Sequence, residues 1–184
     1  MKRTDIINRL IRHNGYKKYL EIGVFKRKTF DNIKIKNKDG VDPLGNCNFK
    51  MTSDVFFKQI DPGTIYDIVF IDGLHIKDQV LRDIDNSLMQ LSKNGIIVVH
   101  DCNPKSKYMA DPVWNGTVWE AIVELRMTRS DLDICVVDED FGCGLIRVGH
   151  QELLIAADLS WEALDLNRKK YLNLISVSEF LERY

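Results

Sequence analysis

The chain has 184 residues, 45% of them hydrophobic and 29% charged, and 26 basic against 27 acidic side chains leave a formal net charge of −1. A length of about 100–200 residues predicts one domain, spanning 1–184, and the composition excludes a disordered, collagen-like or coiled-coil chain. The balanced charge argues against a nucleic-acid partner. Apolar runs such as 96–99 are far shorter than the roughly 20 residues that cross a bilayer, which argues against a membrane partner. Four cysteines without a CxxC pair predict reduced thiols and a cytoplasmic protein.

Strand and helix periods alternate along the chain. The apolar patterns predict helices at 4–13, about 28–35, 53–61, 80–91, 118–125, from 161 and after 176. Strands are predicted at 19–22, up to 40–43, at 66–71, 96–99, 132–137 and 145–148. The last two strands are joined too tightly for a crossover helix, so they must run antiparallel. This order predicts an α/β fold, a Rossmann-like, doubly wound and mostly parallel sheet that ends in an antiparallel C-terminal hairpin.

Polar side chains follow the predicted strands at the edge of the sheet where such folds bind ligands. The five groups are Glu21 to Gly23, Asp42 with Pro43, Ser53 with Asp54, Asp72 to His75, and His100 to Asn103. Any one group alone is explained as a turn, since Asp and Gly dominate turns. Five groups at one edge predict a binding site.

The first two groups suggest a nucleoside. Glu21 and Gly23 end a strand, and Asp42 follows about 20 residues later, where Rossmann-like folds place an acid on the ribose hydroxyls. The dinucleotide fingerprint is absent, because Phe25 and Thr29 stand where glycines are required. A carboxylate on the strand repels a pyrophosphate and favours a cation. The nucleoside cation that fits is the sulfonium of S-adenosylmethionine (SAM).

An ordered set of segments then carries a resemblance to a known family. The segments are 19–25, 40–43, 66–75, 95–104 and 114–119. With them the chain resembles the class I SAM-dependent methyltransferases, and within these a small bacterial group associated with sugar and polysaccharide biosynthesis. The resemblance implies SAM as cofactor and O-methylation of a small hydroxylated acceptor (EC 2.1.1.-), such as a sugar, a sugar nucleotide or a glycan precursor. The implied cofactor-binding residues are Glu21, Gly23, Val24, Phe25, Asp42, Pro43, Ser53, Asp54 and Asp72. A homo-oligomer is compatible with the sequence.

One departure from the family leaves alternatives open. Where its loop carries a further glycine, this chain has Lys26, Arg27 and Lys28. Arg27 either points to solvent or weakens the binding of a cationic cofactor. In the second case the chain is a non-catalytic or cofactor-impaired Rossmann-like domain. An NAD-binding oxidoreductase is the third reading, and the missing glycines disfavour it.

Methyl transfer to an alcohol needs a group that removes the proton of the hydroxyl. His75 is the candidate base, with Asp72 and Asp101 beside the acceptor. Asp72, His100 and Asp101 form a candidate site for Mg²⁺, as in related metal-dependent O-methyltransferases. The alternative is that Asp101 and Asn103 only shape a turn. The polar segment 105–115, which contains Tyr108, Pro112 and Trp114, is expected to wall the acceptor site.

Overall fold

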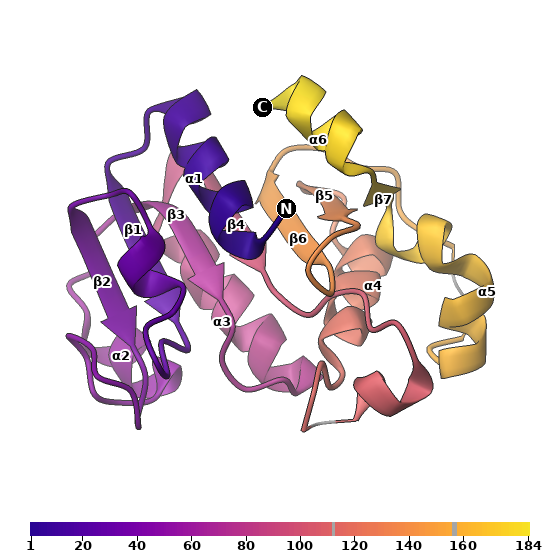
Figure 1. The fold of residues 1–184 in the computed structure, drawn as a ribbon, viewed down its shortest axis with the longest axis horizontal. Helices are drawn as coiled ribbons and strands as arrows, with labels where there is room; N and C mark the ends of the chain where they lie inside the picture. The colour runs from indigo at the N-terminus through magenta and orange to yellow at the C-terminus, as the bar shows by residue number, and fades with distance from the viewer. Residues whose placement is uncertain (112, 156–157) are drawn as a thin grey trace.

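The computed structural model describes residues 1–111, 113–155 and 158–184, which form one mixed sheet between two layers of helices (Figure 1). The strand order is β2-β1-β3-β4-β6-β5-β7. The strands are β1 Lys18–Ile22, β2 Asn37–Val41, β3 Tyr66–Ile71, β4 Leu91–Val99, β5 Leu132–Val137, β6 Cys143–Val148 and β7 Leu174–Ile175. β1 to β4 pair in parallel, whereas β6 runs antiparallel to both β4 and β5. The predicted fold class is therefore confirmed.

Two apolar cores cover the two faces of the sheet. The helices are α1 Arg3–Asn14, α2 Ser53–Gln59, α3 Lys77–Met89, α4 Val118–Thr128, α5 Trp161–Leu172 and α6 Val177–Arg183. α1 and α6 pack on one face, and the other four helices pack on the opposite face. Because both faces are buried, the central strands are almost continuously apolar. Among the helices in the described ranges, none has the length and apolar character of a membrane span.

The segment predicted as a helix at 28–35 contains only a short 3₁₀ turn, η1 Phe30–Asn32. Tertiary partners take the backbone groups that a helix would use. The Asn8 side chain donates to the Asn32 carbonyl and accepts from the Lys34 amide, at 2.9 and 2.7 Å. Lys38 Nζ donates to the Ile33 carbonyl. The prediction of an α-helix here was wrong because local periodicity does not record these contacts.

The pair Asn94 and Gly95 predicts the stop of the helix expected at 80–91, and this prediction was also wrong. α3 ends at Met89, and Leu91 already begins β4. The pairing of β3 with β4 shifts register between Tyr66 and Ile68, so the first part of β4 bulges. A Cβ on Gly95 would lie 2.6 Å from the Leu91 side chain, which explains a glycine inside a strand.

Two further differences lie in the second half of the chain. β7, which pairs in parallel with β5, was not predicted, because two residues are too few to show a period. The spacing of Thr117 and Glu120 predicts a capping box, which does not form. The Thr117 hydroxyl instead accepts from the Lys77 amide at 2.8 Å and so joins α4 to α3. The capping box at Ser176 and Glu179 is present.

The packing of α6 gives a first prediction. Phe180 is fully buried against the face that α1 covers, whereas Leu181 on the same helix is 38% exposed. Phe180→Ala should lower the free energy of unfolding by about 3–5 kcal/mol, since it leaves a cavity in a close-packed core. Leu181→Ala is the matched control and should cost less than about 1 kcal/mol. Urea denaturation measures both values, and equal losses would contradict this packing.

Candidate active site

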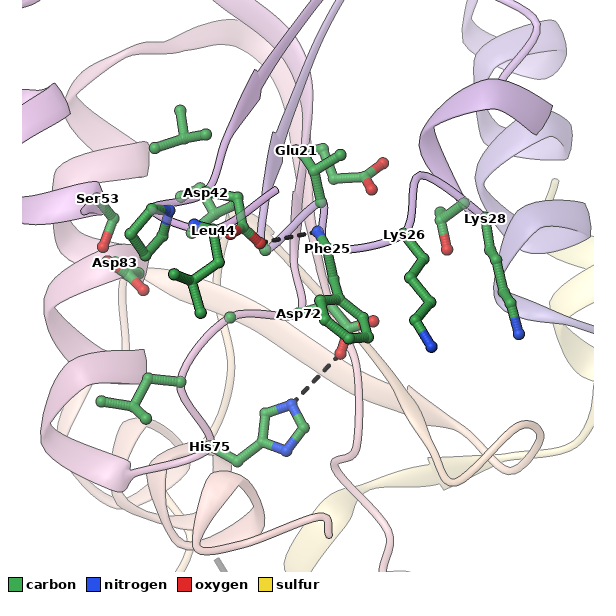
Figure 2. Close-up of a pocket in the computed structure, with 18 of the residues that line it drawn as sticks. Glu21, Phe25, Lys26, Lys28, Asp42, Leu44, Ser53, Asp72, His75 and Asp83 are labelled. Atoms are coloured by element: carbon green, nitrogen blue, oxygen red, sulfur yellow. Dashed lines mark hydrogen bonds and ion pairs between the residues drawn. The ribbon is translucent and has the colours of Figure 1, made fainter. Parts of the chain in front are cut away.

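A cavity of about 1260 Å³ opens at the carboxyl ends of β1, β2 and β3 (Figure 2). It is lined by all the residues that were predicted to bind a cofactor, namely Glu21, Gly23, Val24, Phe25, Asp42, Pro43, Ser53, Asp54 and Asp72. His75 lines it as well, whereas His100 and Asp101 lie behind the wall. Ser53 and Asp54 reach the cavity from the start of α2 rather than from a strand end, contrary to the sequence prediction.

The floor of the cavity is a backbone contact between β1 and β3. Gly23 has φ +90°, and a Cβ there would lie 2.1 Å from the Asp72 carbonyl oxygen. The Gly23 amide donates to Val41 at 2.9 Å, and the Asp72 amide donates to Ile22 at 2.8 Å. Only glycine permits this approach, because any side chain would collide with backbone atoms that cannot yield.

Glu21 is a buried carboxyl group in the cavity wall. Its Oε2 accepts a hydrogen bond from the Tyr19 hydroxyl, and its Oε1 has no hydrogen-bond partner among the described residues. Burial, together with the charge of Asp72, raises the pKa of Glu21 to about 8 against the opposing effects of Tyr19, Lys38 and the Phe30 backbone. An unpartnered buried carboxyl oxygen at this place fits the cationic end of a ligand such as SAM.

Asp42, the predicted ribose ligand, already accepts three hydrogen bonds. Its Oδ2 accepts from the Phe25 amide at 2.8 Å, a contact drawn in Figure 2. Its Oδ1 accepts from the amides of Leu44 and Gly45 at 2.7 and 2.6 Å. A carboxylate offers about four acceptor positions. Asp42 therefore ties together the loops that follow β1 and β2, and it has room for about one further hydrogen bond.

Arg27 does not line the cavity. Its guanidinium donates to Asp31 at 2.8 Å and to the Asn46 carbonyl at 2.6 Å, and it stacks over the Phe30 ring. Lys26 and Lys28 on either side of it do line the cavity, and Figure 2 shows both side chains at its mouth. The positive charge of this loop thus reaches the cavity through the two lysines.

Asp72, His75 and Asp101 meet at the other end of the cavity. His75 Nε2 lies 3.4 Å from Asp72 Oδ1 and 3.3 Å from Asp101 Oδ2. The Trp114 carbonyl contacts His75 Nδ1 and can only accept, so we assign the proton to Nδ1 and titration to Nε2. Burial alone would lower the pKa of His75, but the hydrogen bond to Asp72 and the charge of Asp101 raise it above its ordinary value.

Arg3, which the sequence did not suggest, holds this cluster from α1. Its Nη1 lies 2.8 Å from Asp72 Oδ2, and its Nε lies 3.0 Å from Asp140 Oδ2. His100 is buried beneath them, with Nδ1 3.0 Å from Asp101 Oδ1. Despite the opposing effect of burial, His100 and Arg3 hold the pKa of Asp72 well below its usual range. Arg3 and Asp72 are 69 residues apart, so no local pattern could have connected them.

The residues of the predicted metal site fit Mg²⁺ poorly. The three side chains whose ligand atoms lie within 4.8 Å of one another are Asp72, His75 and Asp101, with His75 in the place predicted for His100. Mg²⁺ prefers oxygen ligands, whereas this set includes an imidazole. The guanidinium of Arg3 already neutralises Asp72. This set of side chains therefore does not match the ligands that Mg²⁺ prefers.

Gly23 generates the second prediction. Gly15, which ends α1, has φ +68° but no atom within 4 Å of an added Cβ, so it is the matched control for backbone strain. Gly23→Ala should lower the free energy of unfolding by about 1–3 kcal/mol more than Gly15→Ala, because it adds a collision to the strain. Urea denaturation of the two variants gives this difference. Equal losses would mean that β1 and β3 are not in backbone contact here.

Solved methyltransferases share the fold. A SAH-bound methyltransferase from Podospora anserina, PaMTH1, is 17% identical, with a TM-score of 0.59 over 80% of this chain and 78% of that one. The O-methyltransferase TomG from Streptomyces achromogenes, in complex with SAM, is 16% identical, with a TM-score of 0.61 over 79% of each chain. An O-methyltransferase from Bacillus cereus in complex with SAH is 14% identical, with a TM-score of 0.58 over 78% of each chain.

Sequence comparison gives the family. No curated protein matches the chain. A family model described as a methyltransferase domain matches residues 7–102, which is more than half of the chain and includes β1 to β4 with the cavity floor. The chain therefore belongs to this methyltransferase domain family.

Proposed function

We propose that the chain binds SAM in the cavity and transfers its methyl group to a hydroxyl group of a small acceptor, a sugar or glycan precursor. Membership of the methyltransferase family supports the transfer, and the SAM- or SAH-bound structures with the same fold support the cofactor. The observation that carries the proposal is Glu21, a buried carboxyl group with a free oxygen in the wall of the cavity. Such a group is costly to ionise unless a cation pairs with it.

Three groups of cavity residues hold the three parts of a bound cofactor. Glu21 and Gly23 hold the cationic amino-acid end, Asp42 offers one acceptor position to the ribose, and Ser53 and Asp54 lie toward the base. When bound, SAM supplies a methyl group on a positively charged sulfur atom. The protein contributes position, because an in-line displacement needs the acceptor oxygen opposite that sulfur.

His75 is placed to take the proton of the acceptor hydroxyl. Its Nε2 faces Asp72 and Asp101, which stabilise the imidazolium that forms. Asp101 lies behind the cavity wall and acts through His75, so it is a positioning residue. The Asn115 side chain donates to Asp101 and fixes it in turn.

An exposed aromatic pair, in the segment whose backbone contacts His75, favours a sugar as the acceptor. Tyr108 and Trp114 are 71% and 51% exposed, with ring centroids 6.1 Å apart, and the Trp114 carbonyl contacts His75. Exposed aromatic faces beside a base offer an apolar platform to a ring that carries hydroxyl groups. Pro112, expected in the same wall, lies outside the described residues.

The third prediction concerns the pH dependence of cofactor binding. The raised pKa of Glu21, about 8, means that the free protein holds a proton there at pH 7. Binding an ammonium group requires the ionised form, so affinity for SAH should rise with pH, by up to about tenfold per unit between pH 6 and 8. Calorimetry at pH 7 in two buffers of different ionisation enthalpy should detect release of about one proton.

Glu21→Gln is the control for this linkage, because its amide oxygen still accepts from the Tyr19 hydroxyl. The variant should bind SAH more weakly at pH 8 and should release no proton on binding. If the affinity for SAH depends on pH equally in both proteins, Glu21 does not bind the cationic end of the ligand. Titration with NAD in parallel tests the oxidoreductase reading, and binding of neither ligand would favour a domain that has lost its cofactor.

The fourth prediction concerns catalysis. With an acceptor identified by mass detection among sugar nucleotides, His75→Gln should lower kcat by about 10²–10⁴ and leave the affinity for SAH unchanged. The wild-type rate should fall below a pKa that lies above 6.5, since that of His75 is raised, and the variant should lose this acid limb. His150→Gln, at an exposed histidine, is the matched control. A chelator should leave kcat unchanged. Inactivation by a chelator that Mg²⁺ reverses would instead support Asp72 and Asp101 as metal ligands.

A further inference from the structure

The part of the cavity beside Ser53 carries a buried acid that neither the family motifs nor the proposed transfer uses. Asp83 projects from α3, lines the cavity and is 1% exposed. Figure 2 shows it beside Ser53, at the end of the cavity where α2 and α3 meet. Gln79 Nε2 donates to Asp83 Oδ1 at 3.0 Å, and it lies 3.2 Å from both Ser53 Oγ and Asp54 Oδ1.

Asp83 has no ion pair among the described residues. The neighbouring arginine, Arg82, donates instead to the side-chain Oε1 of Gln79, and its Nε lies 3.5 Å from Asp54 Oδ1. Burial, together with the like charge of Asp54, raises the pKa of Asp83 to about 6 against the opposing hydrogen bonds of Ser53 and Gln79. A buried carboxylate with acceptor positions to spare is stabilised by a ligand that donates to it.

The walls beside Asp83 are apolar and belong to two loops. Pro43 and Leu44 follow β2 on one side, and Leu74 follows β3 on the other. Leu44 is 85% exposed and Leu74 is 58% exposed, so both present aliphatic surface that no other part of the described chain covers. Apolar walls that end in a hydrogen-bond acceptor suit a flat heteroaromatic ring with an amino group at its edge.

We infer that Asp83 selects the base of the cofactor, by accepting a hydrogen bond from the exocyclic amino group of adenine. The inference rests on the proposed function, which places the nucleoside between Asp42 and α2. A hypoxanthine ring has a carbonyl oxygen where adenine has the amino group. That oxygen would face the carboxylate of Asp83 and repel it, so the site should discriminate between the two bases.

Calorimetric titration of the full chain with SAH and with its hypoxanthine analogue, S-inosylhomocysteine, at pH 8 tests this inference. The wild type should bind SAH about 10–150 times more tightly, the value of a hydrogen bond to a charged group. Asp83→Asn should reduce the ratio to within about threefold, because an amide can accept from the amino group or donate to the carbonyl. Asp78→Asn, at an exposed position on the same helix, is the matched control and should keep the wild-type ratio.

The remaining outcomes separate this inference from the proposed function. Asp83→Asn removes a charge that burial disfavours, so at pH 8 it should unfold at the same or a higher temperature than the wild type. Wild-type protein that binds SAH without discrimination, or an Asp83→Asn variant that keeps the full ratio, overturns the role of Asp83 and leaves cofactor binding intact. Loss of the ratio in Asp54→Asn instead would assign the base to Asp54. Failure of the wild type to bind either ligand overturns the proposed function itself.

Discussion

The contact between Gly23 and the Asp72 backbone is the constraint on which the site depends. Two parallel strands end side by side, and the missing Cβ allows their following loops to touch. The side chains nearest the contact, Glu21 and Asp72, therefore face one cavity from neighbouring strands. A bulkier residue at Gly23 would separate the two loops and with them the two acids, so the geometry of the charges follows from a backbone requirement.

The acids around the cavity fall into two groups according to what satisfies them. Asp72 is neutralised by Arg3. Three backbone amides donate to the carboxylate of Asp42 and leave it about one acceptor position. Glu21 and Asp83 are buried and form no ion pair among the described residues, and burial raises the pKa of both. The first group has a structural explanation within the protein. In the second group, burial makes the ionised carboxylate costly in the free protein. A ligand with a cationic end at Glu21 and an amino group at Asp83 would offset that cost.

Sequence patterns predicted the parts of the site that are local. The period of the buried strands fixed the sheet, and because parallel strands present their carboxyl ends at one edge, the groups around Gly23, Asp42 and Asp72 were expected to meet. Arg3 and Asp83 were not predicted, since each reads as one polar position on an amphipathic helix. His100 follows a strand and was placed in the metal site, yet it is buried as a partner of Asp101. The spacing of residues along the sequence predicts that His100 lies at the carboxyl edge of the sheet. It does not predict whether the side chain lines the cavity or is buried.

The connection between β2 and β3, residues 42–65, contains α2 and packs it against α3 beside the cavity. Beyond β2, the chain makes only an isolated bridge between Val41 and Phe49 before α2 begins. α2 itself has seven residues, and its Phe56 is buried in the same core as Ile84 of α3. Because α3 packs against α2, it supplies two polar side chains, Gln79 and Asp83, to the lining of the cavity. Recognition of the base by Asp83, one turn along α3 from Gln79, would therefore rest on a helix residue and not on a strand-end residue.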